Sequence, residues 1–132
     1  MREILFRGKT AEGDWTYGYY VHTPKRTGAF GQTVSQADVD RHHILTMKCN
    51  IIKEIYPETI GQYTGLTDKN GKKIFEGDIV KNSIGTFIVK FLYGTFCCSL
   101  IEENYLTELC SIHNQCEVIG NIHDNPELLK GE

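Results

Sequence analysis

The sequence predicts a mainly β protein, built from short antiparallel strands in one or two small barrel-like domains. Strand-sized apolar runs alternate with glycine-centred turns along most of the 132 residues. Seven Tyr, six Phe and thirteen Gly also favour strands and turns over helices. Glycines at the corners of short strands are typical of a barrel, because a sheet that closes on itself has to bend.

The first two strands are predicted at residues 4–7 and 15–21, with a Glu-Gly-Asp turn at 12–14 between them. In the second strand alternation places Trp15, Tyr17 and Tyr19 on one face. We interpret this face as the inner wall of a sheet, the usual place for large aromatic side chains. The alternative, a solvent-facing strip that stacks on bases or sugars, stays open.

Residues 23–40 are polar and rich in glycine, which predicts a long excursion, either a hairpin arm or a mobile loop. Two further strands are predicted at 43–47 and 51–56. Pro57 limits the second of these, because the residue before a proline is restricted.

The segment 62–80, QYTGLTDKNGKKIFEGDIV, specifies backbone geometry more strongly than any other part of the chain. Asp68, Asn70 and Gly71 have the residue types of a tight hairpin turn, since Asn and Gly tolerate positive φ and an Asp carboxylate accepts hydrogen bonds from following N–H groups. Gly77 and Asp78 are predicted to form a second turn before the next strand. Glu76 and Asp78 could also serve as a carboxylate pair, but short polar residues are the usual turn formers.

The remaining strands are predicted at 86–93, 96–101 and 115–122. Between them, Leu106, Leu109, Cys110 and His113 have the spacing of an amphipathic helix, so one helix is expected near 102–113. The alternation of Tyr105, Thr107 and Leu109 leaves a strand open for its first half. A short C-terminal helix is expected at 126–129, with Asn125 as its N-cap and Pro126 at its first position.

The chain resembles the YopX family of phage and prophage proteins in three blocks. These are MREILFRGK with WTYG at the start, ETIGQYTGLTDKNGKKIFEGDIV at 58–80 and VIGNIHDNPELL at 118–129. The resemblance implies a mostly β fold and a gene carried by a phage or prophage. It implies no activity and no catalytic residues.

The length predicts one YopX-like domain over residues 1–132, because a chain of this size can bury about two thirds of its extended surface. A subdivision is possible: an N-terminal β part at 1–57, which contains the 23–40 excursion, and a barrel part at 58–132 with the C-terminal helices.

The distribution of charge and the use of cysteine exclude few classes of protein function. Residues 99–132 hold seven acidic residues and one lysine, whereas 1–98 hold thirteen basic and ten acidic residues, which allows head-to-tail contacts between copies. The five cysteines fit no disulfide framework, and Cys110, His113 and Cys116 lack the spacing of a zinc site, so buried free thiols are expected. No apolar run approaches the ~20 residues of a membrane span or the ~7–15 of a secretory signal, which predicts a protein of the host cytoplasm.

We therefore expect a non-catalytic protein-interaction module without cofactor or metal. Its partner would be a second copy or a phage or host protein. A first alternative is an accessory nucleic-acid-binding protein that uses Lys69, Lys72, Lys73, Lys81 and Lys90, with Phe75 and Phe87 beside them, although the acidic tail disfavours it. A second is a small metal-dependent hydrolase built from Glu76, Asp78 and a distant histidine; no catalytic motif supports it.

Overall fold

A computed structural model describes residues 3–25, 39–46 and 50–130. The fold is mainly β, with antiparallel sheets and one short helical segment. The chain divides into two compact units, an N-terminal unit of Leu5–Ile60 and a C-terminal unit of Gly61–Glu132 together with Met1–Ile4. No helix in the described part of the chain is long and apolar enough to cross a membrane.

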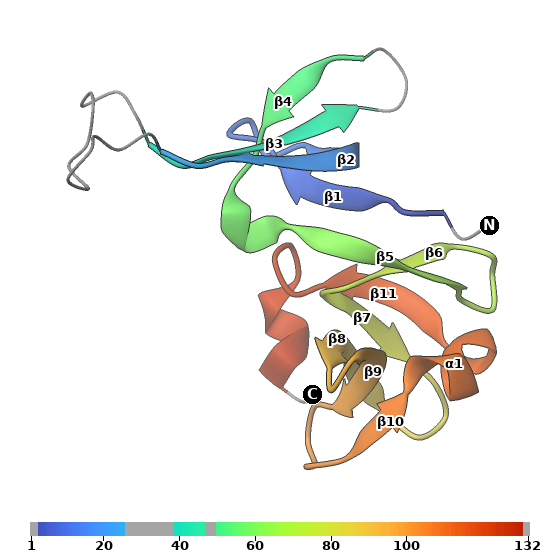
Figure 1. Ribbon diagram of the computed structural model, residues 1–132. Helices are drawn as coiled ribbons and strands as arrows, with labels where there is room; N and C mark the ends of the chain where they lie inside the picture. The colour runs from blue at the N-terminus through green and yellow to red at the C-terminus, as the bar shows by residue number, and fades with distance from the viewer. Residues whose placement is uncertain (1–2, 26–38, 47–49, 131–132) are drawn as a thin grey trace. The chain divides into compact units, whose positions relative to one another are not determined.

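The N-terminal unit contains four antiparallel strands in the order β4-β3-β2-β1, followed by a single 3₁₀ turn, η1 (Figure 1). β2 and β3 stay paired up to the Thr23–Arg41 partners. Most of the expected 23–40 excursion lies outside the described residues. The bounds are β1 (Phe6–Lys9), β2 (Trp15–Thr23), β3 (Arg41–Thr46), β4 (Ile52–Glu54) and η1 (Pro57–Thr59).

Gly18 sets the packing of β2 against β3. A Cβ at this position would lie 1.9 Å from the carbonyl oxygen of Leu45 and 3.1 Å from Cγ2 of Ile44. Ile44 is fully buried, and Thr16 and Gly18 of β2 are buried as well. The backbone of β3 therefore approaches β2 so closely that no side chain fits at this point.

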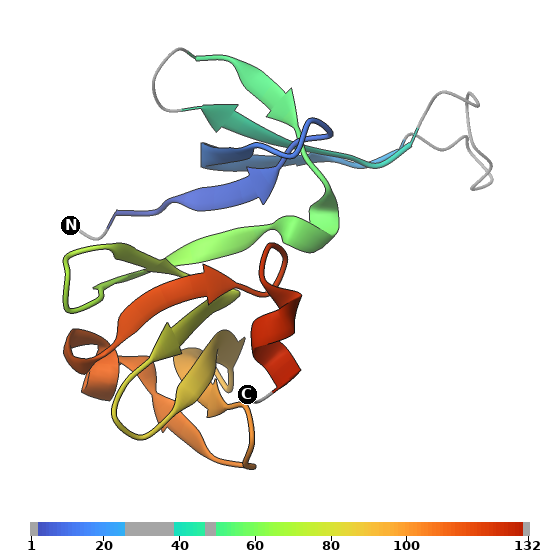
Figure 2. The same cartoon turned by 180° about the vertical axis from the view of Figure 1, so that it is seen from behind.

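In the C-terminal unit β5 pairs with β6, and the strands after them form a five-stranded antiparallel sheet in the order β10-β9-β8-β7-β11 (Figures 1 and 2). The strands are β5 (Gly61–Thr67), β6 (Lys73–Phe75), β7 (Asp78–Lys81), β8 (Thr86–Leu92), β9 (Thr95–Leu100), β10 (Leu106–Glu108) and β11 (Glu117–Asn121). The helical turns are α1 (Leu109–Ile112), η2 (His113–Gln115) and η3 (Pro126–Lys130).

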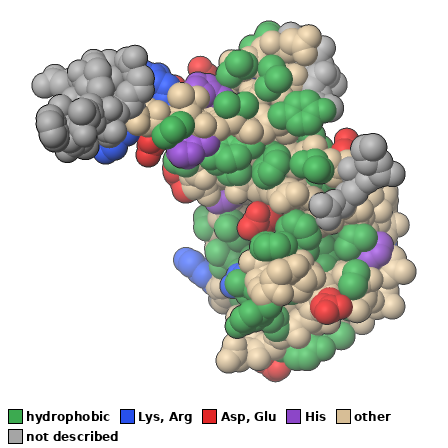
Figure 3. All heavy atoms as spheres, viewed as in Figure 1, with side chains coloured by type: hydrophobic (Ala, Val, Ile, Leu, Met, Phe, Trp, Pro, Cys, Tyr) green, Lys and Arg blue, Asp and Glu red, His purple; other side chains and the backbone are tan. Residues whose placement is uncertain are grey.

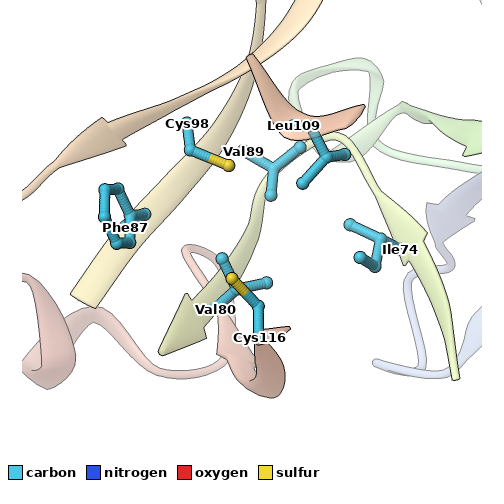
Figure 4. Packing of buried hydrophobic residues seen from close by; sticks show 7 residues of the cluster. All are labelled: Ile74, Val80, Phe87, Val89, Cys98, Leu109 and Cys116. Carbon is cyan, nitrogen blue, oxygen red and sulfur yellow. The ribbon is translucent and has the colours of Figure 1, made fainter. Parts of the chain in front are cut away.

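The core of this unit lies on one face of the sheet. β6, β7, β8, β9, α1 and the residue before β11 all contribute to it (Figure 4). Burial, together with the neighbouring Cys116 and Cys97, raises the pKa of Cys98 to about 12. Burial also raises the pKa of Cys116. Both thiols thus stay protonated and pack as small apolar groups. The cluster consists of Ile74, Val80, Phe87, Val89, Cys98, Leu109 and Cys116.

The Asp68 carboxylate fixes the β5–β6 hairpin and joins it to β11. Its Oδ1 accepts the backbone N–H groups of Asn70 (2.8 Å) and Lys72 (2.9 Å), and its Oδ2 accepts that of Val118 (2.9 Å). Burial by itself would raise the pKa of Asp68, but these three hydrogen bonds and the charge of Lys72 lower it below its ordinary value. The carboxylate is therefore most stabilising when ionised.

The second predicted turn joins β6 to β7 through Gly77, at φ +93°. Asp78, only 2% exposed, accepts the backbone N–H of Phe75 at 2.8 Å. The N–H of Gly77 donates to the carbonyl of Val89 at 2.9 Å, and its own carbonyl accepts the N–H of Ile122 at 2.9 Å. This turn is thus tied to β8 and to the end of β11.

Three expectations about secondary structure and topology differ from the structure. No closed barrel is found among the described strands: β10 and β11 are the two ends of the five-stranded sheet. The helix expected near 102–113 is confined to 109–112 with a 3₁₀ turn behind it, and 106–108 form β10 because they pair with β9. Asn125 precedes a 3₁₀ turn, but its Oδ1 accepts the N–H of Asn121 at 3.2 Å, on the strand side.

The Asp68 network makes stability depend on pH in one direction. Because the folded state lowers the pKa of Asp68, its contribution is complete above the ordinary value of 3.8 and is lost as pH falls through the lower native value. Asp68→Asn should cost about 1–3 kcal/mol at pH 7. The difference from wild type should shrink below pH 3.8, measured by urea unfolding. Glu102→Gln, at an exposed position in the same unit, is the control and should change little.

Gly18→Ala should destabilise the N-terminal unit by about 2–3 kcal/mol, because the added methyl group overlaps the Leu45 carbonyl and forces the two strands apart. Gly94→Ala is the comparison: its Cβ meets nothing within 4 Å, so only the φ of +78° opposes it, at about 1 kcal/mol. Equal losses in thermal unfolding of the two variants would contradict the close approach.

Candidate functional site

The solvent side of β2 in the N-terminal unit carries large apolar and aromatic side chains. Tyr17, Tyr19 and Val21 are 43%, 51% and 40% exposed, while the alternate residues Thr16 and Gly18 are buried. The expectation that the aromatic residues of this strand form an inner wall is therefore wrong for both tyrosines. The alternation of the two faces along β2 was predicted correctly. The buried face, however, is the one that carries the small residues Thr16 and Gly18, where the backbone of β3 comes close to Gly18.

The neighbouring strands extend this surface. Tyr19 lies opposite Leu45, which lies opposite Ile52, and Val21 lies opposite His43, which lies opposite Glu54. Directly opposed residues of antiparallel strands project to the same side. Ile52 is 59% exposed. We call this surface the outward face; it consists of Tyr17, Tyr19, Val21, Arg41, His43, Leu45, Ile52 and Glu54.

Hydrophobic side chains gather over the region that β2, β3 and β4 occupy, with histidines near the base of the β2–β3 ribbon (Figure 3). Arg41, which lies opposite Thr23, places a positive charge at one end of the outward face. Arg7 of β1 lies opposite Tyr17 but is only 6% exposed, so it adds no charge to this surface. The guanidinium of Arg7 is 4.6 Å from the Trp15 ring centroid, and the Lys9 ammonium is 5.6 Å from it.

The other side of the same sheet carries a stacked histidine pair. The rings of His22 and His42 are 4.5 Å apart and parallel within 1°, and the Tyr20 hydroxyl is 2.6 Å from Nδ1 of His42. The His22 Nε2 is 3.9 Å from the Asp40 carboxylate. A cavity of about 400 Å³ beside His42 is lined by Ala11, Asp40, His42, Glu54, Ile55, Tyr56 and Pro57. Sequence reasoning missed this pairing, because only the register of β2 with β3 brings the two rings together.

The lysines of the nucleic-acid alternative are all exposed, but they spread over β6, β7, β8 and the hairpin turn. Lys73 forms an ion pair with Glu3 at 2.9 Å and lies 5.1 Å from the Tyr63 ring centroid. Lys81 lies opposite Glu117. Phe75 and Phe87, 4% and 0% exposed, are core residues, so neither can stack on a base. The positions concerned are Lys69, Lys72, Lys73, Lys81 and Lys90.

The residues proposed for metal or acid–base chemistry serve as structural groups. Asp78 accepts its hydrogen bond inside a turn, and Oε1 of Glu76 lies 3.5 Å from the backbone N–H of Gln62. Within 3–25, 39–46 and 50–130, no group of three or more His, Cys, Asp or Glu could hold a metal ion.

Cys110, His113 and Cys116 have three different environments. Cys110 is exposed, contrary to the expectation of buried thiols, whereas Cys116 is fully buried. Nδ1 of His113 lies 2.7 Å from the carbonyl oxygen of Thr67. The ring of His113 therefore holds η2 against β5, and the three side chains make no common site.

Comparison with known proteins supports the fold described above. The chain is similar to protein EF1440 from Enterococcus faecalis, known from a crystal structure, with 23% identity and a TM-score of 0.54. The similarity covers 98% of this chain and 100% of that one, and at this identity it shows the fold alone. No curated protein matches the chain.

Residues 6–130 match the family described as YopX protein. The matched range includes both compact units, and it contains the three sequence blocks on which the resemblance depends, apart from the first five residues. The chain belongs to the YopX protein family.

Proposed function

We propose that this protein is a non-catalytic protein-interaction module that binds through the outward face. The proposal rests on the solvent exposure of three residues of β2, Tyr17, Tyr19 and Val21. β2 is paired along its length with β1 or β3, so these side chains project from a backbone that is already ordered. Binding would then cost little conformational entropy in the sheet.

The composition of the outward face fits a protein partner. Two tyrosines, two branched aliphatic residues and a leucine make an apolar centre, and Arg41, His43 and Glu54 provide polar groups around it. Tyrosine and arginine are enriched among the residues that dominate binding energy, and protein interfaces commonly combine an apolar centre with a polar rim.

The proposal includes the biological setting that the resemblance to phage and prophage proteins implies. The module would act in the cytoplasm of a host cell, with a second copy or a phage or host protein as its partner. Self-association is the simplest form, because it needs no further gene product.

Single-stranded nucleic acid is a second candidate for the same surface. The specific observation in its favour is the solvent exposure of Tyr17 and Tyr19, with the partly exposed Lys9 close by at Trp15. Exposed aromatic rings on a sheet stack on bases, and neighbouring cations contact phosphates. In this form of the proposal the nucleic-acid contact is on β2, and the lysines of β6, β7 and β8 take no part in it.

A photo-crosslinking amino acid at position 19, introduced into the protein in its host cell, should give protein adducts. The matched control carries the same group at position 90, an exposed strand position in the C-terminal unit. Adducts that resist nuclease and disappear with protease treatment support the proposal. Nuclease-sensitive adducts support the second candidate. Equal adducts at both positions, or none at either, would contradict the outward face as a contact surface.

The nucleic-acid candidate makes its own quantitative prediction. If the aromatic strip binds single strands, Tyr19→Ala should weaken binding to a labelled oligonucleotide by about 1–3 kcal/mol. Lys72→Glu should then have little effect. Fluorescence anisotropy at several salt concentrations measures both. The reverse order of effects would move the contact to the lysines, and no binding by wild type at low salt would end this candidate.

A further inference from the structure

The turn between β5 and β6 contains the one Asn-Gly pair of the sequence, at positions 70 and 71 (Figure 1). The backbone nitrogen of the glycine in such a pair can attack the side-chain carbonyl carbon of the asparagine before it, because no side chain on the glycine shields that nitrogen. The pair is therefore a candidate site for deamidation, a covalent modification that needs no enzyme.

The structure leaves the side chain of Asn70 available for this reaction. Asn70 and Gly71 are both exposed. The backbone N–H of Asn70 donates to Oδ1 of Asp68 at 2.8 Å, but in the described part of the chain the side-chain amide of Asn70 forms no hydrogen bond. A Cβ at Gly71 would meet no atom within 4 Å beyond its chain neighbours, so nothing crowds the approach to this residue.

Asn82 provides a comparison within the same unit. It precedes Ser83, the next smallest residue to follow any asparagine in this sequence. Its Oδ1, however, accepts the backbone N–H groups of Ile84 at 2.8 Å and Gly85 at 3.2 Å, and these bonds hold the side chain in place. Bulkier residues follow the remaining asparagines, at positions 51, 105, 115, 122 and 126. Asn70 is thus the asparagine that both its chain neighbour and its surroundings leave reactive.

We propose that Asn70 is a spontaneous deamidation site, and that its modification loosens the hold of the β5–β6 hairpin on β11. The nitrogen of Gly71 forms a bond to Cγ of Asn70, the bond from Cγ to Nδ2 breaks, and ammonia leaves with the proton of the Gly71 N–H. Water then opens the resulting succinimide ring at either carbonyl. Cleavage at Cγ gives aspartate, and cleavage at the main-chain carbonyl gives isoaspartate, whose main chain runs through Cβ and Cγ. No residue of the outward face takes part, so the reaction is independent of the proposed function.

The fold sets the rate of this reaction through one hydrogen bond. In the closed turn the N–H of Gly71 donates to the main-chain carbonyl of Asp68 at 3.0 Å. That N–H has to lose its proton before the nitrogen can attack, so the turn opens first. Exposed turns open locally at a small cost in free energy. The folded protein should therefore deamidate at residue 70 more slowly than the unfolded chain, and faster as the pH rises.

Isoaspartate at position 70 disturbs the hydrogen bonds of Asp68. Oδ1 of Asp68 accepts N–H groups on both sides of the modified bond, that of residue 70 at 2.8 Å and that of Lys72 at 2.9 Å. An extra main-chain atom between these two donors moves one of them away from the oxygen. Oδ2 holds the N–H of Val118 at 2.9 Å, so a displaced Asp68 side chain loosens its hold on β11. The new carboxylate also repels Asp68, but Lys69 and Lys72 at the same turn offset part of this repulsion, so the added atom is the larger effect.

Incubation of the folded protein at mildly alkaline pH, in water labelled with heavy oxygen, tests the site. Peptide mapping by mass spectrometry should find the label at residue 70, as a mixture of aspartate and isoaspartate, before it appears at residue 82. Asn70→Ser is the matched control and should take up no label in the hairpin, because it has no side-chain carbonyl. Label at residue 82 before residue 70, or none at residue 70, would overturn the assignment.

Amide hydrogen exchange at Val118 tests the consequence. The isoaspartate form carries one more negative charge than the intact protein and can be separated by anion exchange. Its Val118 N–H should exchange about tenfold faster or more, because the bond to Asp68 is weakened. Asn70→Asp adds the charge without the extra atom and should stay within about threefold of wild type. Equal exchange in the isoaspartate form and wild type would overturn the release of β11, and an equal loss in Asn70→Asp would contradict the role of the added atom.

Discussion

The carboxylate of Asp68 is the interaction on which the C-terminal unit depends most. Three backbone N–H groups from two distant parts of the chain donate to its two oxygens, so one side chain closes the β5–β6 turn and holds that turn against the start of β11. The N–H of Lys69 adds a bond to the carbonyl of Cys116 next to it. A buried acceptor of this kind stabilises by satisfying donors that would otherwise be stripped of water.

In the N-terminal unit the corresponding constraint is that Gly18 has no side chain. Gly18 lets the backbone of β3 approach β2, and Ile44 is buried beside it. Because strand residues alternate between two sides, burying Thr16 and Gly18 sends Tyr17 and Tyr19 to the solvent. The exposed aromatic strip is thus a direct consequence of where the small residues lie.

These two constraints separate the residues that hold the fold together from the residues that face solvent. The carboxylates of Asp68 and Asp78 are buried and accept hydrogen bonds from backbone groups. The cysteines of the core are held protonated. In the described part of the chain, the outward face presents an apolar centre to solvent, with Arg41 and Glu54 among the polar groups around it. Surfaces of this kind bind other molecules by contact, which is the role proposed above.

The sequence by itself determined the β class, the positions of most strands, and the turn residues at Asp68, Asn70, Gly71, Gly77 and Asp78. All of these depend on local backbone preferences, which a chain carries wherever it folds. Only the tertiary structure decided which side of β2 is buried, that residues 106–108 pair with β9 instead of joining a helix, and that His22 stacks on His42. Each of these depends on a partner strand, and in β2 and β3 the paired residues lie 18 to 28 positions apart in the chain. Local sequence specifies alternation but not which of two faces meets a neighbour, because burial is a property of the assembled sheet.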